Sequence, residues 1–345
     1  MTGNLNSFDI PILKNISLGL GVQSLYGFSN KYPKDGPFAS VITRAQLPLL
    51  DIKPTIAYKF NERFSIGFGL DIFTFVSFMG EGRFVQHSIA DGNIPNTIPG
   101  QELELNGKGT TVGYNASLLW TPWMTANGKP RVNVGFVWRS RAKLPLNGTL
   151  RADGRKLTGV SSSMQFPDSY EWGVAVWPIR TDLHEWKVEV DVDYVRWSAV
   201  NNFDLTFSDG TALPNPQNWK NAITVGVGTQ WKWMKHTIHP NWDYTLRAGY
   251  IRSHTPIPNQ NFSPAFPDAN LNSITAGFGL GCYGKAKFLW LVPCKNALSK
   301  AIKMDLAYLV FLWESRTVTS HPNPSVNGIY KTITHGGSVT FQLLF

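Results

Sequence analysis

Apolar and polar residues alternate along most of the 345-residue chain, in segments that end at clusters of Pro, Gly, Asn or Asp. A period of two is typical of β-strands, and hardly any stretch repeats with the period of a helix. The sequence therefore predicts an all-β chain of about twelve strands. We expect these strands at residues 16–28, 41–60, 64–85, 109–122, 131–150, 165–177, 185–207, 219–235, 242–251, 272–283, 301–316 and 328–345.

Charged residues gather on one face of individual strands. Residues 187–194 read Lys-Val-Glu-Val-Asp-Val-Asp-Tyr, so one face is apolar and the other carries four charges. A soluble β-sandwich would turn such an apolar face inward, and a single strand is compatible with that fold. Twelve long strands of this kind favour an antiparallel outer-membrane β-barrel, which turns its apolar face to lipid and its polar face to a lumen.

The connections between the predicted strands alternate between short and long. Short links are expected at residues 61–63, 125–130, 179–184 and 235–241, and longer polar loops at 30–37, 86–108, 151–164, 208–218, 253–271 and 317–327. Bacterial barrels have short periplasmic turns and longer outer loops. An aromatic girdle is expected near the short links, formed by Trp120, Trp123, Trp177, Trp186, Trp231, Trp233 and Trp242.

The last predicted strand alternates Val339, Phe341, Leu343 and Phe345 with polar residues, and the sequence stops at that Phe. Outer-membrane barrels commonly end in this way, and we expect Phe345 to be recognised by the barrel-assembly machinery. Residues 1–9 carry no signal peptide, which leaves a chain that is not exported or one whose start is missing.

Composition narrows the choice of class. Charged residues make up 16% of the chain and aromatic residues 13%, which excludes intrinsic disorder. No window approaches 18 consecutive apolar residues, so a helical membrane protein is excluded. The net charge of +9 is dispersed rather than clustered, and no nucleic-acid partner is expected. Gly-x-Ser-x-Gly, phosphate-loop and His-Glu-x-x-His motifs are missing from the sequence, so we expect neither an enzyme nor a bound metal or cofactor.

Several ordered motifs carry a resemblance to a known family. They include Asp-Ile-Lys-Pro-Thr-Ile-Ala-Tyr at 51–58, Phe-Pro-Asp-Ser at 166–169, Trp-Lys-Asn at 219–221 and Thr-Pro-Ile-Pro-Asn-Gln-Asn at 255–261. In this order they resemble the outer-membrane long-chain fatty acid transporter family of the FadL type, which also includes importers of aromatic hydrocarbons. The likeness covers residues 16–345.

The resemblance implies a single transmembrane barrel domain over residues 1–345. The family has about fourteen strands and an N-terminal plug with an Asn-Pro-Ala element, and neither that element nor the first two strands is found in this sequence. The simplest interpretation is an N-terminally truncated chain, and the alternative is a twelve-stranded relative without a plug. In the late loop the family has an Asp before Pro-x-Pro and an Arg after the Asn, where this sequence has Ser253, His254 and Phe262.

The resemblance also implies a function: passive import of long-chain fatty acids or aromatic hydrocarbons, with lateral exit from the lumen at a kinked strand. Tyr26, Gly27 and Phe28 match that kink. We expect Gly27 to adopt the positive φ of a bulge, while the plainer interpretation is a strand that ends in a turn. The expected partners are the hydrophobic ligand, outer-membrane lipid and lipopolysaccharide, for a monomer. A general diffusion porin and an outer-membrane barrel lipase are the alternatives.

A fatty-acid carboxylate would need a cation in the lumen. Arg83 lies within two residues of the position where relatives carry a ligand-facing Arg, and Lys220, a second candidate, matches a family Lys at a strand start. The alternative is that both are ordinary lumen charges paired with an acidic residue such as Asp71, Glu81 or Asp191. The expected apolar lining comes from the segment 89–105 and from Phe73, Phe75, Phe78 and Phe84.

Cys282 and Cys294 flank an insertion at an expected periplasmic turn. Because the periplasm is oxidising, we predict a disulfide between them. A pair of buried free thiols is the alternative, since the sequence does not supply the Cα separation that a disulfide requires.

Overall fold

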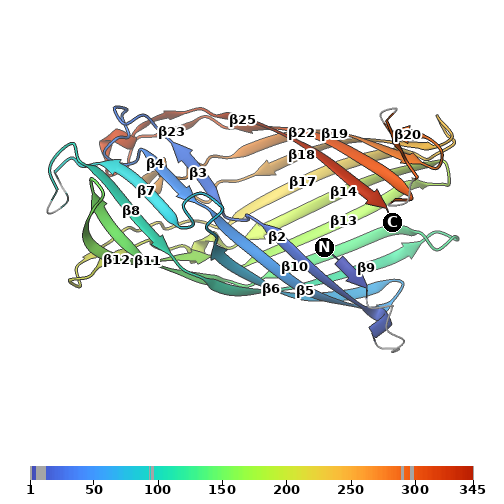
Figure 1. Cartoon of the computed structure of the whole chain (residues 1–345), viewed down its shortest axis with the longest axis horizontal. Helices are drawn as coiled ribbons and strands as arrows, with labels where there is room; N and C mark the ends of the chain where they lie inside the picture. The colour runs from blue at the N-terminus through green and yellow to red at the C-terminus, as the bar shows by residue number, and fades with distance from the viewer. Residues whose placement is uncertain are drawn as a thin grey trace.

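A large antiparallel sheet curls into a barrel wall in the computed structural model, which describes residues 2–4, 13–92, 94, 97–288, 291–295 and 299–344 (Figure 1). The sheet has 13 strands in the order β1-β2-β5-β6-β9-β10-β13-β14-β17-β18-β19-β22-β25, so strands adjacent in the wall follow one another along the chain. Their bounds are β1 (Thr2–Asn4), β2 (Ile16–Gln23), β5 (Leu49–Asn61), β6 (Phe64–Phe75), β9 (Thr111–Met124), β10 (Pro130–Arg139), β13 (Ser169–Arg180), β14 (His184–Val195), β17 (Ala222–Trp233), β18 (Trp242–Ser253), β19 (Leu271–Tyr283), β22 (Ala301–Trp313) and β25 (Ile333–Leu344).

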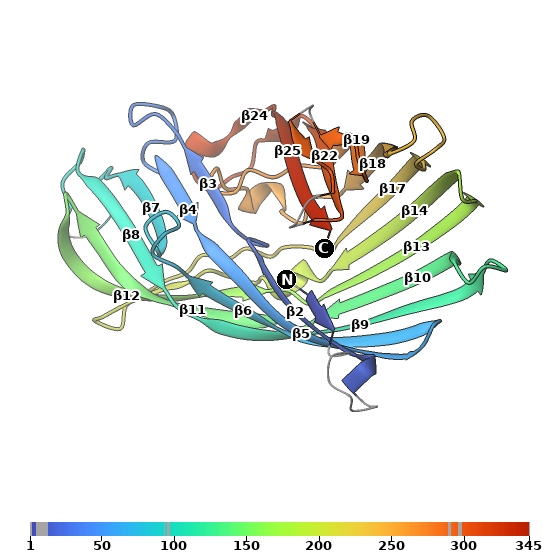
Figure 2. The same ribbon diagram turned by 45° about the vertical axis from the view of Figure 1, so that its right-hand side comes forward.

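The prediction of an all-β antiparallel barrel is confirmed, since each of the twelve expected strands overlaps one long strand of this wall. The three-residue β1 is an addition. In the strand order, β1 and β25 are the two edges of the sheet, and β2 and β25 face each other in Figure 2. Phe345 lies outside the described residues.

Helices are minor in the part of the chain that the structure describes, and none of them is long and apolar enough to cross a membrane. They are the 3-10 turns η2 (Leu13–Asn15), η3 (Trp197–Ala199), η4 (Asn259–Asn261) and η5 (Pro324–Val326).

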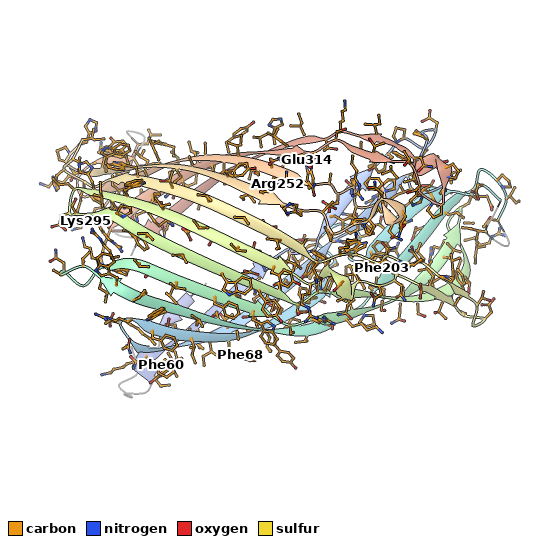
Figure 3. The ribbon with its side chains drawn as sticks, turned by 180° about the vertical axis from the view of Figure 1, so that it is seen from behind. Phe60, Phe68, Phe203, Arg252, Lys295 and Glu314 are labelled. Atoms are coloured by element: carbon orange, nitrogen blue, oxygen red, sulfur yellow. A yellow bond between two sulfur atoms is a disulfide. The ribbon has the colours of Figure 1, made fainter. Side chains whose placement is uncertain are left out.

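The wall has an apolar outward face. One row of cross-strand partners reads Val134, Val174, Val190, Val227, Tyr250, Ile274 and Val310. Phe60 and Phe68, on the same side of their strands as this row, project from the outside of the wall in Figure 3 and are about half exposed. The expected Trp girdle lies on this face except for Trp177, which alternation turns inward and which stacks on the Arg180 guanidinium at 4.5 Å.

The inward face is polar and its charges form pairs. Lys53 Nζ lies 3.2 Å from Asp71 Oδ1, Lys232 Nζ lies 3.1 Å from Asp243 Oδ2, and Arg247 Nη1 lies 2.6 Å from Asp305 Oδ1. These partners come from different strands, so the pairs tie the wall across its lumen side. The charged face of each strand is therefore the lumen face, as the alternation predicted.

A second, eight-stranded sheet continues the wall beyond its long-loop end, on the left of Figure 1. Its order is β16-β15-β12-β11-β8-β7-β4-β3. The bounds are β3 (Phe28–Lys31), β4 (Arg44–Leu47), β7 (Phe84–Ile89), β8 (Glu102–Lys108), β11 (Ala142–Ala152), β12 (Arg155–Phe166), β15 (Leu205–Phe207) and β16 (Ala212–Leu213). Two small hairpins pair β20 (Lys287–Phe288) with β21 (Val292–Pro293) and β23 (Arg316–Val318) with β24 (Gly328–Tyr330).

This second sheet corrects part of the sequence interpretation. The segments 86–108, 151–164 and 208–218 are not loops, because they contain β8, β12 and β16, and the predicted strand 131–150 is two strands, β10 and β11. The Ser-rich β12 reads as a loop because a strand beyond the apolar slab of a membrane does not need an apolar outward face. The chain passes from β10 to β11 at Ser140 and Arg141, without a Gly or Pro to mark the change.

Candidate ligand-binding site

Two cavities lie where the second sheet meets the wall. The inner cavity has a volume of about 600 Å³ and is lined by residues from the β2–β3 connection, the end of β12 and the segment 254–270. The outer cavity has a volume of about 590 Å³ and lies between β8, β11, β12 and the same segment. Both are lined by Met164, Phe203, Phe262 and Phe266, which we call the divider. The two cavities therefore adjoin each other at the divider.

Aromatic rings dominate the inner cavity. Tyr26 and Phe166 stack with their ring centroids 4.3 Å apart, and Trp197 and Trp219 contact each other at 5.2 Å. The rings that line the cavity are Tyr26, Phe28, Phe166, Trp197, Phe203, Trp219, Phe262, Phe266, Trp313 and Tyr330. Of the described lining residues, Asp268 and Glu314 are acidic and none is Lys, Arg or His. The surface can therefore contact a flat apolar molecule but offers no cation to an anion.

Glu314 is paired from outside this lining. Its carboxylate accepts a hydrogen bond from Arg252 Nη1 at 2.5 Å and another from Asn270 Nδ2 at 2.9 Å. Figure 3 shows Arg252 and Glu314 side by side, with Phe203 farther toward the second sheet. Arg252 is thus already paired with Glu314.

A buried arginine fixes the segment 254–270. Arg316 donates to Asn259 Oδ1 at 3.0 Å and to the carbonyl oxygens of Asp268 at 2.6 Å and Ile257 at 2.5 Å. Its guanidinium also lies 4.8 Å from the centre of the Phe262 ring. Because three of its hydrogen bonds go to one segment, Arg316 holds the divider residue Phe262 in place.

Asp268 and Arg316 both have shifted pKa values. Burial raises the pKa of Asp268, against the opposing effects of a 2.5 Å hydrogen bond from the Thr255 hydroxyl and of the nearby Arg316 charge. Burial lowers the pKa of Arg316, and the charge of Asp268 partly offsets that shift.

The wall is interrupted beside the inner cavity. β2 pairs with β5 as far as Gln23 and Asp51, and β3 pairs with β4 from Phe28 and Leu47 onward. Residues 24–27 therefore face residues 48–50 without regular pairing, and Pro48 has no N–H to donate. The expected kink at Tyr26, Gly27 and Phe28 coincides with this interruption, and all three residues line the inner cavity.

The reason proposed for Gly27 is wrong. Its φ is not in the left-handed region, so no bulge dihedral requires a glycine there. A Cβ at this position would instead overlap Ser24 Oγ and lie 3.2 Å from the Leu47 carbonyl oxygen. The Ser24 hydroxyl itself donates to the Leu49 carbonyl at 3.0 Å and bridges the interruption. Gly27 is needed for close approach of two chain segments.

The cations expected to bind a carboxylate lie elsewhere. Arg83 Nη2 is 3.1 Å from both Glu81 Oε2 and Glu104 Oε1, so it is paired, and it lines neither cavity. Lys220 does not line the inner cavity but lines a smaller hollow of about 320 Å³, which shares Ile257, Ala269 and Glu314 with that cavity. Arg83 therefore fits the alternative interpretation, in which it is an ordinary charge paired with Glu81 rather than a ligand-binding cation.

The expected phenylalanine lining is mostly displaced. Phe84 lines the outer cavity. Phe73 is buried behind the inner cavity, with its ring centroid 5.7 Å from that of Tyr26 and 4.8 Å from that of Phe166. Phe75 packs on the same core. Phe78 is 81% exposed in the turn after β6, because that strand ends three residues before it. Besides Tyr26 and Phe28, the rings that line the inner cavity are Phe166, Trp197, Phe203, Trp219, Phe262, Phe266, Trp313 and Tyr330. They fall within expected strands or in the expected loop 253–271, so no pattern in the sequence separates them from other aromatic residues.

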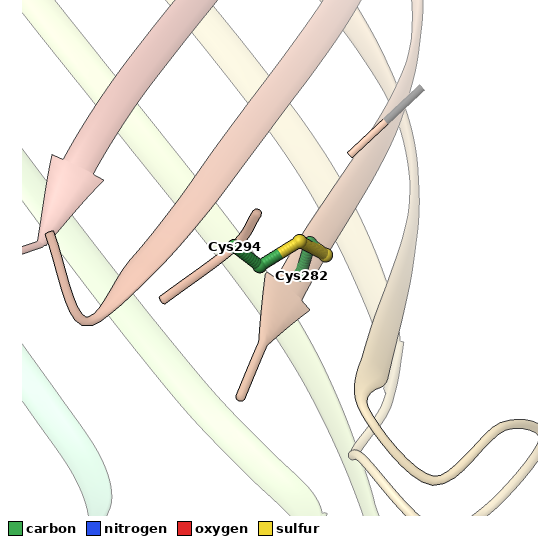
Figure 4. Close-up of a disulfide and its surroundings, with 2 residues drawn as sticks. All are labelled: Cys282 and Cys294. Atoms are coloured by element: carbon green, nitrogen blue, oxygen red, sulfur yellow. A yellow bond between two sulfur atoms is a disulfide. The ribbon is translucent and has the colours of Figure 1, made fainter. Parts of the chain in front are cut away.

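Cys282 and Cys294 are joined by a disulfide, with their Cα atoms 5.5 Å apart (Figure 4). This separation lies in the ordinary range for disulfides. Elsewhere in the described ranges, no group of three or more His, Cys, Asp or Glu residues is placed to hold a metal ion.

Known proteins share both the sequence pattern and the fold. Residues 7–285 match the sequence model of the family described as outer membrane protein transport protein (OMPP1/FadL/TodX). The long-chain fatty acid transport protein of Escherichia coli (strain K12) is 23% identical over 306 residues, covering 78% of this chain and 65% of that protein. That of Salmonella typhi is 22% identical over 298 residues, covering 78% of this chain and 64% of its own length. The chain thus spans just under two thirds of the length of these relatives.

Among solved structures, a Pseudomonas aeruginosa FadL homologue superimposes with a TM-score of 0.67 at 18% identity, covering 96% of this chain and 75% of that one. The Ralstonia pickettii toluene transporter TbuX gives a TM-score of 0.55 at 15% identity, covering 94% of this chain and 76% of that one. These likenesses show the fold. With the sequence model matching most of its length, the chain belongs to the OMPP1/FadL/TodX family of outer-membrane transport proteins.

Proposed function

We propose that this outer-membrane protein imports neutral hydrophobic compounds, aromatic hydrocarbons above all, by passive diffusion and as a monomer. The compound enters the outer cavity, passes the divider into the inner cavity, and leaves sideways at the interruption between β2 and β3. No catalytic step, metal or cofactor is part of this proposal.

The lining of the inner cavity carries the proposal. A buried carboxylate needs a cation or several hydrogen-bond donors, and burying it without them costs several kcal/mol. The described lining offers rings and the acidic residues Asp268 and Glu314 instead. A carboxylate would meet like charge there, while a neutral ring would gain about 0.5–1.5 kcal/mol from each well-placed aromatic contact. Relatives are named for long-chain fatty acids and for toluene, and this lining favours the second class.

The lateral exit rests on the interruption of the wall. A barrel wall is sealed by its inter-strand hydrogen bonds, so an apolar molecule can pass only where a strand loses them locally. Residues 24–27 lack regular pairing, and Leu25 to Phe28 line the inner cavity. An exit there leads from the cavity directly to the lipid-facing side of the wall.

Uptake of labelled toluene and oleate tests this proposal, with the full-length protein expressed in cells that lack their own transporters. We expect saturable toluene uptake that falls about tenfold in Trp219→Ala, because that ring lines the inner cavity. Trp123→Ala is the matched control, since Trp123 is 61% exposed on the outward face near the short turns. Arg83→Ala should leave both uptakes unchanged.

Three results would contradict the proposal. Loss of oleate binding in Arg83→Ala with toluene uptake retained would indicate a fatty-acid site anchored by charge. Uptake of neither compound would reject hydrophobic import altogether. Faster uptake of small hydrophilic solutes than of toluene would indicate a general diffusion porin.

A further inference from the structure

A disulfide-linked flap lies at the end of the wall that carries the short turns. It lies between β19 and β22, and its described residues are 284–288, 291–295, 299 and 300, which include the β20–β21 hairpin. The Cys294 N–H donates to the Ala286 carbonyl at 2.9 Å, and the Lys295 N–H donates to that of Gly284 at 3.1 Å. These two bonds close the flap on itself, and the disulfide to Cys282 at the end of β19 attaches it to the wall (Figure 4).

The flap covers the outward face of the wall. Cys282 pairs across the sheet with Trp242 on one side and Ile302 on the other, and this row lies on the outward face together with Leu246 and Phe278. Phe288 of the flap is 4% exposed, and its ring centroid lies 6.3 Å from those of both Trp242 and Phe341. The flap therefore occupies space that lipid would fill along the rest of this face.

The outer surface of the flap combines exposed apolar residues with positive charge. Leu291 is 80% exposed and Val292 46% exposed. The segment 284–300 contains four Lys residues and no Asp or Glu, and all four are exposed: Lys285, Lys287, Lys295 and Lys300.

We propose that this flap binds anionic phospholipid in the membrane leaflet at the short-turn end of the barrel. The lysines contact the lipid phosphate, while Leu291 and Val292 contact the upper part of the acyl chains. Two observations select this partner: the flap is continuous with the lipid-facing wall, and its charge is of one sign. Apolar residues beside lysines suit the boundary between headgroups and acyl chains. This inference does not depend on what the barrel imports.

Native mass spectrometry of the full-length protein in neutral detergent provides the test, with titrations of dioleoyl phosphatidylglycerol and dioleoyl phosphatidylcholine. The flap variant is Lys285→Gln/Lys287→Gln/Lys295→Gln/Lys300→Gln. The control, Lys31→Gln/Lys108→Gln/Lys143→Gln/Lys156→Gln, changes four exposed lysines at the opposite end and gives the same net charge. Heat-modifiable migration on a gel establishes that each protein is folded before its lipid binding is compared.

We expect the unmodified protein and the control to bind phosphatidylglycerol about tenfold more tightly than phosphatidylcholine, and the flap variant to lose this preference. Equal loss in both variants would show that only the net charge matters, and would overturn the proposal. A protein without any preference for the anionic lipid would overturn it as well. Toluene uptake should be the same in all three proteins, so failure here is distinguishable from failure of the import proposal.

Discussion

Aromatic side chains point inward at the long-loop end of the barrel wall and outward at the short-turn end. At the long-loop end the rings of Trp219, Phe262 and Tyr330 point inward around a cavity, and a buried arginine holds the segment that carries Phe262. At the short-turn end the rings of Trp242 and Phe341 lie on the outward face, and a disulfide attaches a basic flap to them. Inward rings create a space for a ligand, while outward rings create a surface for the membrane.

This difference follows from what each end must exclude. The lumen between the two ends is lined by ion pairs such as Lys53–Asp71 and Arg247–Asp305, which suit a wet interior. An apolar compound gains nothing from that surface. The divider and the inner cavity therefore supply the apolar path at the long-loop end. Variants that affect one end should leave the other unchanged.

Replacing Arg316 should have the largest effect. Arg316→Leu removes three charge-assisted hydrogen bonds and the stacking on Phe262, at a cost of about 4 kcal/mol. We expect faster proteolysis within residues 254–270 and at least about tenfold weaker toluene binding. The control is Arg252→Leu, whose exposed pair with Glu314 contributes less than about 1 kcal/mol. Equal effects of the two variants would mean that Arg316 does not hold the segment.

Removing the disulfide should have the next largest effect, at the other end. A bridge across twelve residues stabilises by about 3 kcal/mol in the chain-entropy account. In Cys282→Ser/Cys294→Ser we expect amide exchange within the flap to accelerate, while toluene binding stays unchanged. Mass spectrometry of the unreduced parent protein should find neither thiol alkylatable. A change in toluene binding would show that the two ends are coupled and would break the comparison.

The alternation of residues was enough to predict the wall, because lipid outside and water inside impose opposite polarity on neighbouring positions of every strand. It could not predict β12 or the break between β10 and β11, because these lie beyond the membrane, where the constraint disappears. The cavity was harder still. Trp197 and Trp219 fall within the expected strands 185–207 and 219–235, and only the fold brings their ring centroids within 5.2 Å of each other.

Arg316 shows a second limit. Its role depends on carbonyl groups of Ile257 and Asp268, 59 and 48 residues away in the chain. A backbone carbonyl leaves no signature in a sequence. Resemblance to the family directed attention to Arg83 and Lys220, whereas the structure pairs the first with Glu81 and Glu104 and puts the second beside a different hollow.

A methyl group at position 27 tests the wall interruption. Gly27→Ala places a Cβ against Ser24 and the Leu47 carbonyl, and such overpacking costs about 2 kcal/mol. We expect slower toluene uptake with binding to the outer cavity retained, because the displaced segment 24–27 borders only the inner cavity. Gly328→Ala is the control, since nothing lies within 4 Å of its added Cβ. Unchanged uptake in Gly27→Ala would remove this position from the exit.

The smallest expected effect concerns the charge of Asp268. Burial raises the pKa of Asp268 in the folded protein, so the protonated carboxyl is favoured there. The stability that this protonation contributes is fully present below the pKa of the unfolded chain, about 4. It is lost as the pH rises through the raised folded pKa, so the segment 254–270 should be slightly less protected at pH 7 than at pH 4. Asp268→Asn keeps an oxygen that accepts from Thr255 and has no charge to bury. The rate of proteolysis within this segment should therefore depend less on pH in the variant. The pH-dependent part of the free energy of opening that the variant removes is less than about 1 kcal/mol. Amide exchange within the flap should depend on pH in the same way in both proteins. If its pH dependence also changed in the variant, the effect would belong to the whole barrel rather than to Asp268.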